Sequence, residues 1–134
     1  GVYKSGFATT QTAFDEAVVP LFDTLDWLEQ RLSGQRSLLG DVLSEADWRL
    51  FTTLIRFDPV YVGHFKCNIR RLEDYPKLWA YTRELYQYEA VSETINMHHI
   101  KHHYYVSHTT INPSGVVPVG PDLDMYMPHG REQI

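Results

Sequence analysis

The stretch FDEAVVPLFDTLDWLEQRL, residues 14 to 32, decides the fold class of this chain. Its apolar residues recur in alternating steps of four and three, at Phe14, Val18, Leu21, Leu25, Leu28 and Leu32. Since an α-helix turns once in about 3.6 residues, this spacing places them on one face of a long amphipathic helix. Pro20 removes one backbone hydrogen bond within the segment and predicts a kink or a break there. Ser33-Gly34 then predict the end of the helix.

A second helical region is predicted to start in the segment LSEADW, residues 43 to 48. Ser44 can cap the amide three residues on while Asp47 reaches back, which is a capping-box pattern. The helix should end before Asp58-Pro59, because the residue that precedes a proline avoids the helical region. A separate short helix is expected over residues 60–67.

The remaining sequence predicts two more helices and then an irregular tail. Asp74-Tyr75-Pro76 is typical of a helix start with Asp74 as the cap, and residues 92–105 also have a helical pattern. That pattern rests on apolar and imidazole side chains at three-to-four spacing: Ile95, His99, His102 and Val106. Beyond Ser107, prolines and glycines end the periodicity. The tail is expected to pack along the helices through its apolar residues, which are Val116, Val117, Val119, Leu123 and Met125.

No alternation of period two appears, so the fold is predicted to be all-α, with a helical core over residues 1–108 and an irregular tail over residues 109–134. A length of 134 residues suits one domain. The net charge of −5 argues against nucleic acid and anionic membranes as partners. One cysteine and the lack of an apolar run of about 18 residues predict a cytoplasmic protein. The opening GVYKSG has no initiator Met and is expected to be a cut through a longer chain.

Five segments in order resemble one family. They are GVYKSGFATTQ at the start, RFDPVYVGHFKCN (residues 56–68), HIKHHYYVSH (99–108), TINPSGVVPVGP (110–121) and PHGR (128–131). These segments resemble the Xi-class glutathione transferases, the glutathionyl-hydroquinone reductases, and the capping box resembles the helix start of transferase C-terminal domains generally. The resemblance implies that residues 1–134 form a helical transferase C-terminal domain. The thioredoxin-like N-terminal domain of that family is expected to be absent from this sequence.

The resemblance also implies an activity for the parent protein. A cysteine thiolate attacks the glutathionyl sulfur of a glutathione-conjugated hydroquinone, and a second glutathione regenerates the cysteine, which is thiol exchange. That cysteine and most of the glutathione-binding residues belong to the thioredoxin-like half, so no catalytic residue is expected here and this chain alone should be inactive. The implied partners are quinone or hydroquinone conjugates, glutathione as co-substrate, the thioredoxin-like domain and a second copy in a homodimer.

Four residues are predicted to bind the substrate. Tyr3 and Tyr104 match positions where the family sets tyrosines around the quinone ring, and a phenol offers both a flat face and a hydrogen-bond donor. Tyr61 and His64 lie three residues apart and would share a helix face in the same pocket. The structural alternative for all four is a packing or interface role. Asp58 and its neighbour Arg56 could equally form a local ion pair or a turn.

Two further features are interpreted as structural. Cys67 has no CxxC partner or helix-start position, so it is expected to be a small buried hydrophobe. Four histidines, His98, His99, His102 and His103, make two pairs spaced four apart. Each pair supplies only two ligands where zinc takes three or four, so a polar helix face is favoured and no metal is expected. The alternative functions are a non-catalytic helical interaction module and, more weakly, a histidine-based metal protein.

Overall fold

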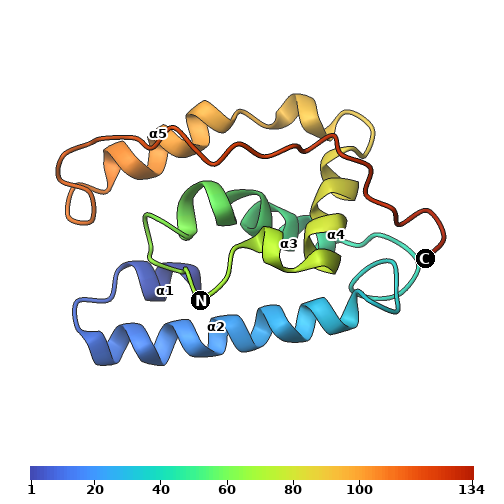
Figure 1. The fold of residues 1–134 in the computed structure, drawn as a ribbon, viewed down its shortest axis with the longest axis horizontal. Coiled ribbons are helices and arrows are strands. Elements are labelled where there is room, and N and C mark those ends of the chain that lie inside the picture. Colours follow the sequence, from blue (N-terminus) through green and yellow to red (C-terminus); the bar gives the residue numbers. More distant parts are fainter.

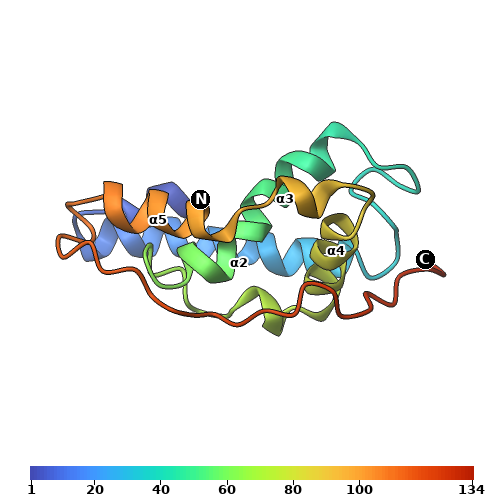
Figure 2. The same ribbon diagram turned by 90° about the horizontal axis from the view of Figure 1, so that it is seen from above.

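The computed structural model describes residues 1–134 and contains helices but no β-strand, as the sequence predicts. Its α-helices are α1 (Val2–Gly6), α2 (Gln11–Arg31), α3 (Glu45–Arg56), α4 (Pro76–Tyr86) and α5 (Met97–Ser107). A π-helix, η1 (Phe57–Tyr61), follows α3 directly, and two 3₁₀ helices, η2 (Leu72–Asp74) and η3 (Val91–Thr94), precede α4 and α5. The long α2 lies along one edge of the molecule and α5 along the opposite edge, with α3, η1 and α4 between them (Figure 1). Seen from above, α5 overlies the first part of α2 (Figure 2).

Helix α2 forms the predicted amphipathic face. Thr10 caps it by accepting a hydrogen bond from the amide of Ala13 at 3.2 Å. Its buried side chains are Ala17, Val18, Phe22, Leu25 and Leu28. The prediction of a break at Pro20 is wrong, because the helix continues through that residue to Arg31. Pro20 is exposed, and its carbonyl accepts a hydrogen bond from the Thr24 hydroxyl at 2.9 Å.

Helix α3 begins at the predicted capping box of Ser44 and Asp47. The Asp47 carboxylate is fully buried and accepts from the Ser44 amide at 2.8 Å, the Leu38 amide at 2.8 Å and the Tyr81 hydroxyl at 2.7 Å. Burial alone would raise the pKa of Asp47, but these hydrogen bonds outweigh it and lower the pKa. One acidic side chain therefore joins the start of α3, the preceding loop and α4.

Helix α3 ends at Arg56, before Asp58-Pro59, as predicted, but the chain does not leave the helical path there. It widens into η1, in which the Val62 amide bonds to the Phe57 carbonyl five residues back, at 3.0 Å. The π-turn accommodates Pro59. This residue has no amide hydrogen to donate, and the wider turn continues the helical path without that hydrogen bond. The expected separate helix over residues 60–67 is absent as such: η1 ends at Tyr61 and a turn follows.

Asp58 is neither an ion-pair partner of Arg56 nor a simple turn residue. Its carboxylate accepts from the amides of Leu72 at 2.5 Å and Glu73 at 3.2 Å, so it caps the first residues of η2. Burial raises the pKa of Asp58 despite these two hydrogen bonds.

Helix α4 has Pro76 in its first turn, as predicted, but Asp74 does not cap it. Asp74 accepts from the Arg71 amide at 2.9 Å, within the turn that contains η2. The amides of Lys77 and Leu78 instead donate to Glu29 of α2, at 2.8 and 2.7 Å. A carboxylate from a neighbouring helix thus caps α4 in place of Asp74, the cap predicted from the sequence.

Helix α5 is shorter than expected and buries two tyrosines. Asn96 caps it by accepting from the His99 amide at 3.0 Å, and residues 91–94 form η3 instead of its first turn. His98, His99, His102 and His103 are exposed, as expected of a polar helix face, whereas Tyr104 and Tyr105 are buried. Burial follows the tyrosines because their large rings remove more apolar surface from water than an imidazole does.

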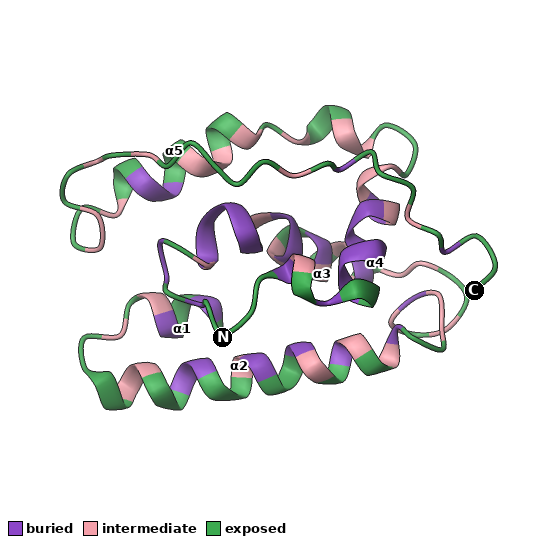
Figure 3. Ribbon diagram, in the orientation of Figure 1, coloured by how far each residue is buried: buried purple, intermediate pink, exposed green.

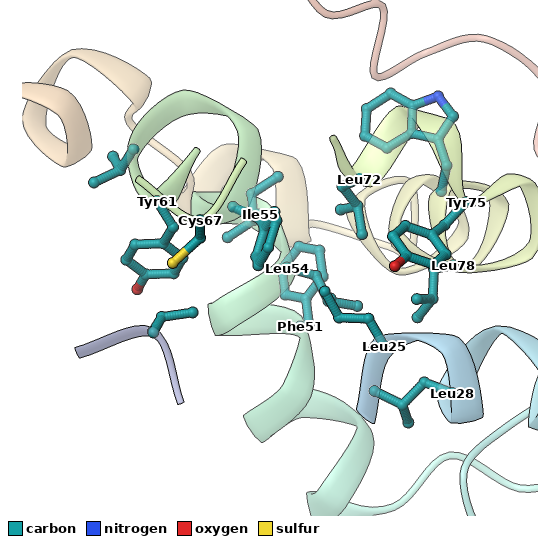
Figure 4. Packing of buried hydrophobic residues seen from close by; sticks show 14 of the residues in the cluster. Leu25, Leu28, Phe51, Leu54, Ile55, Tyr61, Cys67, Leu72, Tyr75 and Leu78 are labelled. Carbon is teal, nitrogen blue, oxygen red and sulfur yellow. The ribbon is translucent and has the colours of Figure 1, made fainter. Parts of the chain in front are cut away.

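The hydrophobic core is one contiguous cluster. It contains side chains from each of the five α-helices, from η1 and from the tail residue Met125. Figure 4 shows part of it, with Tyr61 and Cys67 at one end and Tyr75 and Leu78 at the other. The buried residues gather in η1 and α4 and along one stripe of α2 (Figure 3).

The tail after Ser107 is irregular, as predicted, and runs back past α5 to α4 (Figures 1 and 2). Met125 is buried, but Val116 and Val119 are exposed, so the expected apolar packing holds only for part of the tail. Polar contacts also hold the tail, since Gln87 donates to the Met125 carbonyl at 2.7 Å. Near the C-terminus the side chain of Arg131 is buried, with 1% of its surface exposed.

Candidate functional site

Three tyrosines that are far apart in the sequence meet at one end of the molecule. The hydroxyl of Tyr104, on α5, lies 2.6 Å from the hydroxyl of Tyr3 on α1 and 3.1 Å from that of Tyr61 in η1. Tyr61 and Tyr104 are buried, at 3% and 4% exposure, whereas Tyr3 is 49% exposed. The three hydroxyls therefore form a chain that runs from the core to the surface, and we call these residues the tyrosine chain.

The direction of the two hydrogen bonds follows from burial. If Tyr3 donated to Tyr104 and Tyr104 to Tyr61, the buried Tyr61 hydroxyl would hold a proton with no acceptor, since Tyr104 is its one hydrogen-bond partner. An unsatisfied buried donor costs about 1–3 kcal/mol. The opposite order, from Tyr61 through Tyr104 to Tyr3, leaves the spare O–H on the exposed Tyr3. The tyrosine chain thus presents a hydrogen-bond donor at the surface.

The surroundings keep these phenols protonated. Burial, and then the hydrogen bond with Tyr104, raises the pKa of Tyr61 well above the usual value for a tyrosine. The pKa of Tyr3 is also raised, by burial first and then by its hydrogen bond with Tyr104. At neutral pH both groups act as donors and neither acts as a base.

Two phenylalanines complete the aromatic surface around Tyr3. Phe65 is fully buried and lies edge-on to Tyr3, with ring centroids 5.3 Å apart, and Phe7 is 46% exposed at 6.3 Å from Tyr3. Gly6 allows this approach, because a Cβ there would lie 2.1 Å from the Phe65 ring. Gly63 allows a similar approach of Tyr105, whose hydroxyl would lie 2.8 Å from an added Cβ.

Two histidines flank the tyrosine chain. His64 Nε2 lies 3.0 Å from Nδ1 of His108, and His64 is 4% exposed. Burial, followed by the charges of His108 and Lys66, lowers the pKa of His64 to about 4. Burial also lowers the pKa of His108, with His103 as the second cause. Both rings are therefore neutral at neutral pH.

All four residues predicted from the sequence lie in this one cluster. Tyr61 and His64 do belong together, since both contact Phe65, at centroid distances of 5.5 and 5.1 Å. Sequence reasoning missed Phe65 and His108, although both stand in segments that carry the resemblance. Their signal was adjacency: each lies within four residues of a predicted site residue. Whether the cluster binds substrate stays a prediction.

The other chemically notable residues lie outside the cluster or are inert. Cys67 is fully buried, and burial raises its pKa to about 11, as expected of a structural thiol. His98 and His102 stack on the exposed side of α5 with ring centroids 3.8 Å apart. No group of three His, Cys, Asp or Glu side chains is arranged to hold a metal ion. A cavity of about 510 Å³ lies between α5 and residues 117–119 of the tail.

No helix in the structure is both long enough and apolar enough to cross a membrane.

The chain is closely similar to several known proteins. Residues 11–84 match the family described as "Glutathione S-transferase, C-terminal domain". The glutathionyl-hydroquinone reductase PcpF of Sphingobium chlorophenolicum is 61% identical over 121 residues, which are 90% of this chain and 39% of that protein. The glutathionyl-hydroquinone reductase YqjG of Escherichia coli K12 is 54% identical over 132 residues, 98% of this chain and 40% of that protein. The chain thus spans about two fifths of the length of these relatives.

Solved structures agree with the sequence matches. A glutathione-bound structure of YqjG from Escherichia coli K-12 superposes with a TM-score of 0.97 at 53% identity, covering 98% of this chain and 43% of that one. A Xi-class glutathione transferase from Natrialba magadii also gives 0.97, at 48% identity, covering 99% of this chain and 41% of that one. With the family match over more than half of its length and the helices superposing throughout, the chain belongs to the glutathione S-transferase C-terminal domain family, and its predicted similarity to the Xi class is confirmed.

Proposed function

We propose that this chain is the hydroquinone-binding helical domain of a glutathionyl-hydroquinone reductase. The observation that carries the proposal is the tyrosine chain, which ends in an exposed O–H donor on Tyr3 beside the half-exposed ring of Phe7. A flat aromatic diol needs a ring surface and a donor to its oxygen atoms, and this cluster offers both. The names of the relatives PcpF and YqjG support the same reaction class.

The proposed reaction balances as a thiol exchange. A cysteine thiolate of a thioredoxin-like domain attacks the glutathionyl sulfur, the bond from sulfur to the ring carbon breaks, and that carbon takes up a proton to give the hydroquinone. The resulting mixed disulfide is reduced by a second glutathione, which leaves as glutathione disulfide. A donor at a ring oxygen, which is the role of Tyr3, stabilises the negative charge that the ring takes up as the bond breaks.

The proposal implies several partners. Glutathione is the co-substrate, bound mainly by the thioredoxin-like domain that this helical domain would contact. A second copy of the chain would pair with it through helical surfaces, and exposed apolar side chains such as Trp27, Leu39 and Val42 support such an interface. The chemistry suits the cytoplasm, where glutathione is kept reduced.

The test titrates the 134-residue chain with the glutathione thioether of hydroquinone, using NMR signals of isotope-labelled tyrosine rings. The Tyr3 and Tyr104 signals should shift on addition of the conjugate. Tyr3→Phe and Tyr104→Phe should each weaken binding about two- to tenfold, because each removes one neutral hydrogen bond. In the full-length protein that contains this chain, the same variants should lower kcat/KM by a similar factor.

The matched control is Tyr88→Phe, since Tyr88 is exposed at 44% beside Trp48, outside the cluster. Its affinity should equal that of the wild type. Unchanged affinity in both Tyr3→Phe and Tyr104→Phe would remove the pair from the site. If the conjugate shifts no tyrosine signal and full-length kinetics are also unchanged, a non-catalytic interaction module becomes the better interpretation.

A further inference from the structure

A histidine pair at the edge of the tyrosine chain has its proton positions fixed by burial. His64 lies in the turn after η1, and His108 is the C-cap of α5. Their rings share one hydrogen bond, between His64 Nε2 and His108 Nδ1 at 3.0 Å. Only one of the two nitrogens can carry the shared proton when both rings are neutral.

The other ring nitrogen of His64 decides which one. His64 Nδ1 is buried and has no hydrogen-bond partner. If His108 donated, neutral His64 would have to carry its proton on this buried Nδ1 as an orphaned N–H, which native structures almost never contain. If His64 donates from Nε2, Nδ1 holds only an unused lone pair, which is the milder penalty. His64 is therefore the donor and His108 the acceptor.

This assignment settles the tautomer of His108. Because its Nδ1 accepts from His64, neutral His108 must carry its proton on Nε2, which has no partner within the chain. The low pKa of His64 keeps that ring uncharged at neutral pH and so preserves the arrangement. His108 is half-buried, so its Nε2–H can reach a ligand at the surface.

The position of His108 relates this donor to the tyrosine chain. The ring of His108 lies edge-on to Phe7 and Tyr104, at centroid distances of 5.1 and 5.5 Å. Phe7 also packs against Tyr3. Phe7 thus contacts both donor-bearing rings, Tyr3 and His108, which come from opposite ends of the sequence, and a ligand ring seated on its exposed side would lie beside both.

We propose that His108 donates a hydrogen bond from Nε2 to one oxygen of the bound hydroquinone while Tyr3 donates to the other, and that His64 is the positioning residue that holds His108 in this tautomer. This inference rests on the proposed function and adds a basis for specificity. Two donors at one ring favour a diol over a phenol with a single oxygen, because the unmatched donor then loses its partner.

The first experiment reads the tautomer directly. Nitrogen NMR of the ¹⁵N-histidine-labelled 134-residue chain distinguishes a protonated from an unprotonated ring nitrogen. Wild-type His108 should show a protonated Nε2, His64→Leu should give a mixture of tautomers, and His64→Gln should restore the wild-type signal because its amide can donate from a similar place. A His108 ring that is protonated at Nδ1 in the wild type overturns the inference.

The second experiment tests the contact with the ligand, using the glutathione thioethers of hydroquinone and of phenol as probes. His108 Nε2 should shift on addition of the hydroquinone conjugate, and His108→Phe should weaken its binding about two- to tenfold. The preference for hydroquinone over phenol should fall by the same factor. His99→Phe, an exposed position on the same helix, should change neither value.

The outcomes separate this inference from the proposed function. Binding that depends on Tyr3 but leaves the His108 signal and the His108→Phe affinity unchanged overturns the role of His108 and leaves the hydroquinone site intact. Binding that disturbs neither Tyr3 nor His108 overturns both.

Discussion

Replacing Arg131 by Ala should destabilise the domain by about 3 kcal/mol. Arg131 lies in the tail and is 1% exposed, and its guanidinium donates to Glu84 at 2.7 Å, to the Leu32 carbonyl at 3.1 Å and to the Arg36 carbonyl at 2.6 Å. It also stacks over the Tyr81 ring, 5.5 Å from its centroid. Removing one partner of a buried ion pair costs about 3–5 kcal/mol. The lower end applies because Glu84 keeps its ion pair with Arg36.

Equilibrium urea unfolding, followed by far-ultraviolet circular dichroism, measures this loss at constant m. The melting temperature should fall by about 10 °C for a domain of this size. Arg49→Ala is the matched control, since its ion pair with Glu45 is 79% exposed on both sides and such helix pairs are worth only about 0.3–0.5 kcal/mol. A loss for Arg131→Ala that is no larger than that of Arg49→Ala would refute the view that this residue anchors the tail.

Three further predictions concern pH, thiol reactivity and assembly. Burial lowers the pKa of His64 to about 4 in the folded chain, whereas its pKa in the unfolded chain is about 6.5. Below pH 6.5 the unfolded chain therefore binds more protons than the folded chain. The free energy of unfolding should be highest above that pH and fall by about 1–3 kcal/mol towards pH 4. His64→Gln should reduce this slope in urea titrations, and an unchanged slope would contradict the assignment. Cys67, with a pKa of about 11, should resist iodoacetamide in the native chain and react in urea, as read by mass spectrometry. The chain alone should not turn over glutathionyl-hydroquinones, and turnover abolished by Cys67→Ser would identify a catalytic thiol. Sedimentation at micromolar concentration should give a dimer, whereas a clean monomer mass would exclude the proposed helical interface.

Local patterns in the sequence predicted the parts of the fold that depend on neighbours along the chain. The periodicity from Phe14 to Leu32 predicts the buried stripe of α2, and the pattern at Ser44 predicts the start of α3. The joining of Tyr3 to Tyr104 could not follow from spacing, since 101 residues separate them. Only the family resemblance brought the pair to notice.

The missed features depend on groups distant in sequence. No pattern near Pro76 indicates that Glu29 of α2 caps α4, and no pattern around Arg131 indicates its burial against Glu84. The burial of Tyr104 and Tyr105 on α5 was not predicted, because helical period alone does not indicate which side of a helix the rest of the fold covers. His108 was missed because its partner His64 stands 44 residues away in the sequence.

The π-turn at Phe57–Tyr61 also sets the direction in which the side chains at its C-terminal end project from the helix axis. Each residue of an α-helix advances the chain by about 100° around its axis, so the wider turn carries one residue more than an α-helical path of the same rise. Deleting a single residue there would swing Tyr61 and His64 round by about that angle while Tyr104 stayed fixed on α5. The hydrogen bond between Tyr61 and Tyr104, at 3.1 Å, and that between His64 and His108, at 3.0 Å, would then both be lost. The geometry of the cluster is thus encoded in the chain length of this segment as well as in its side chains.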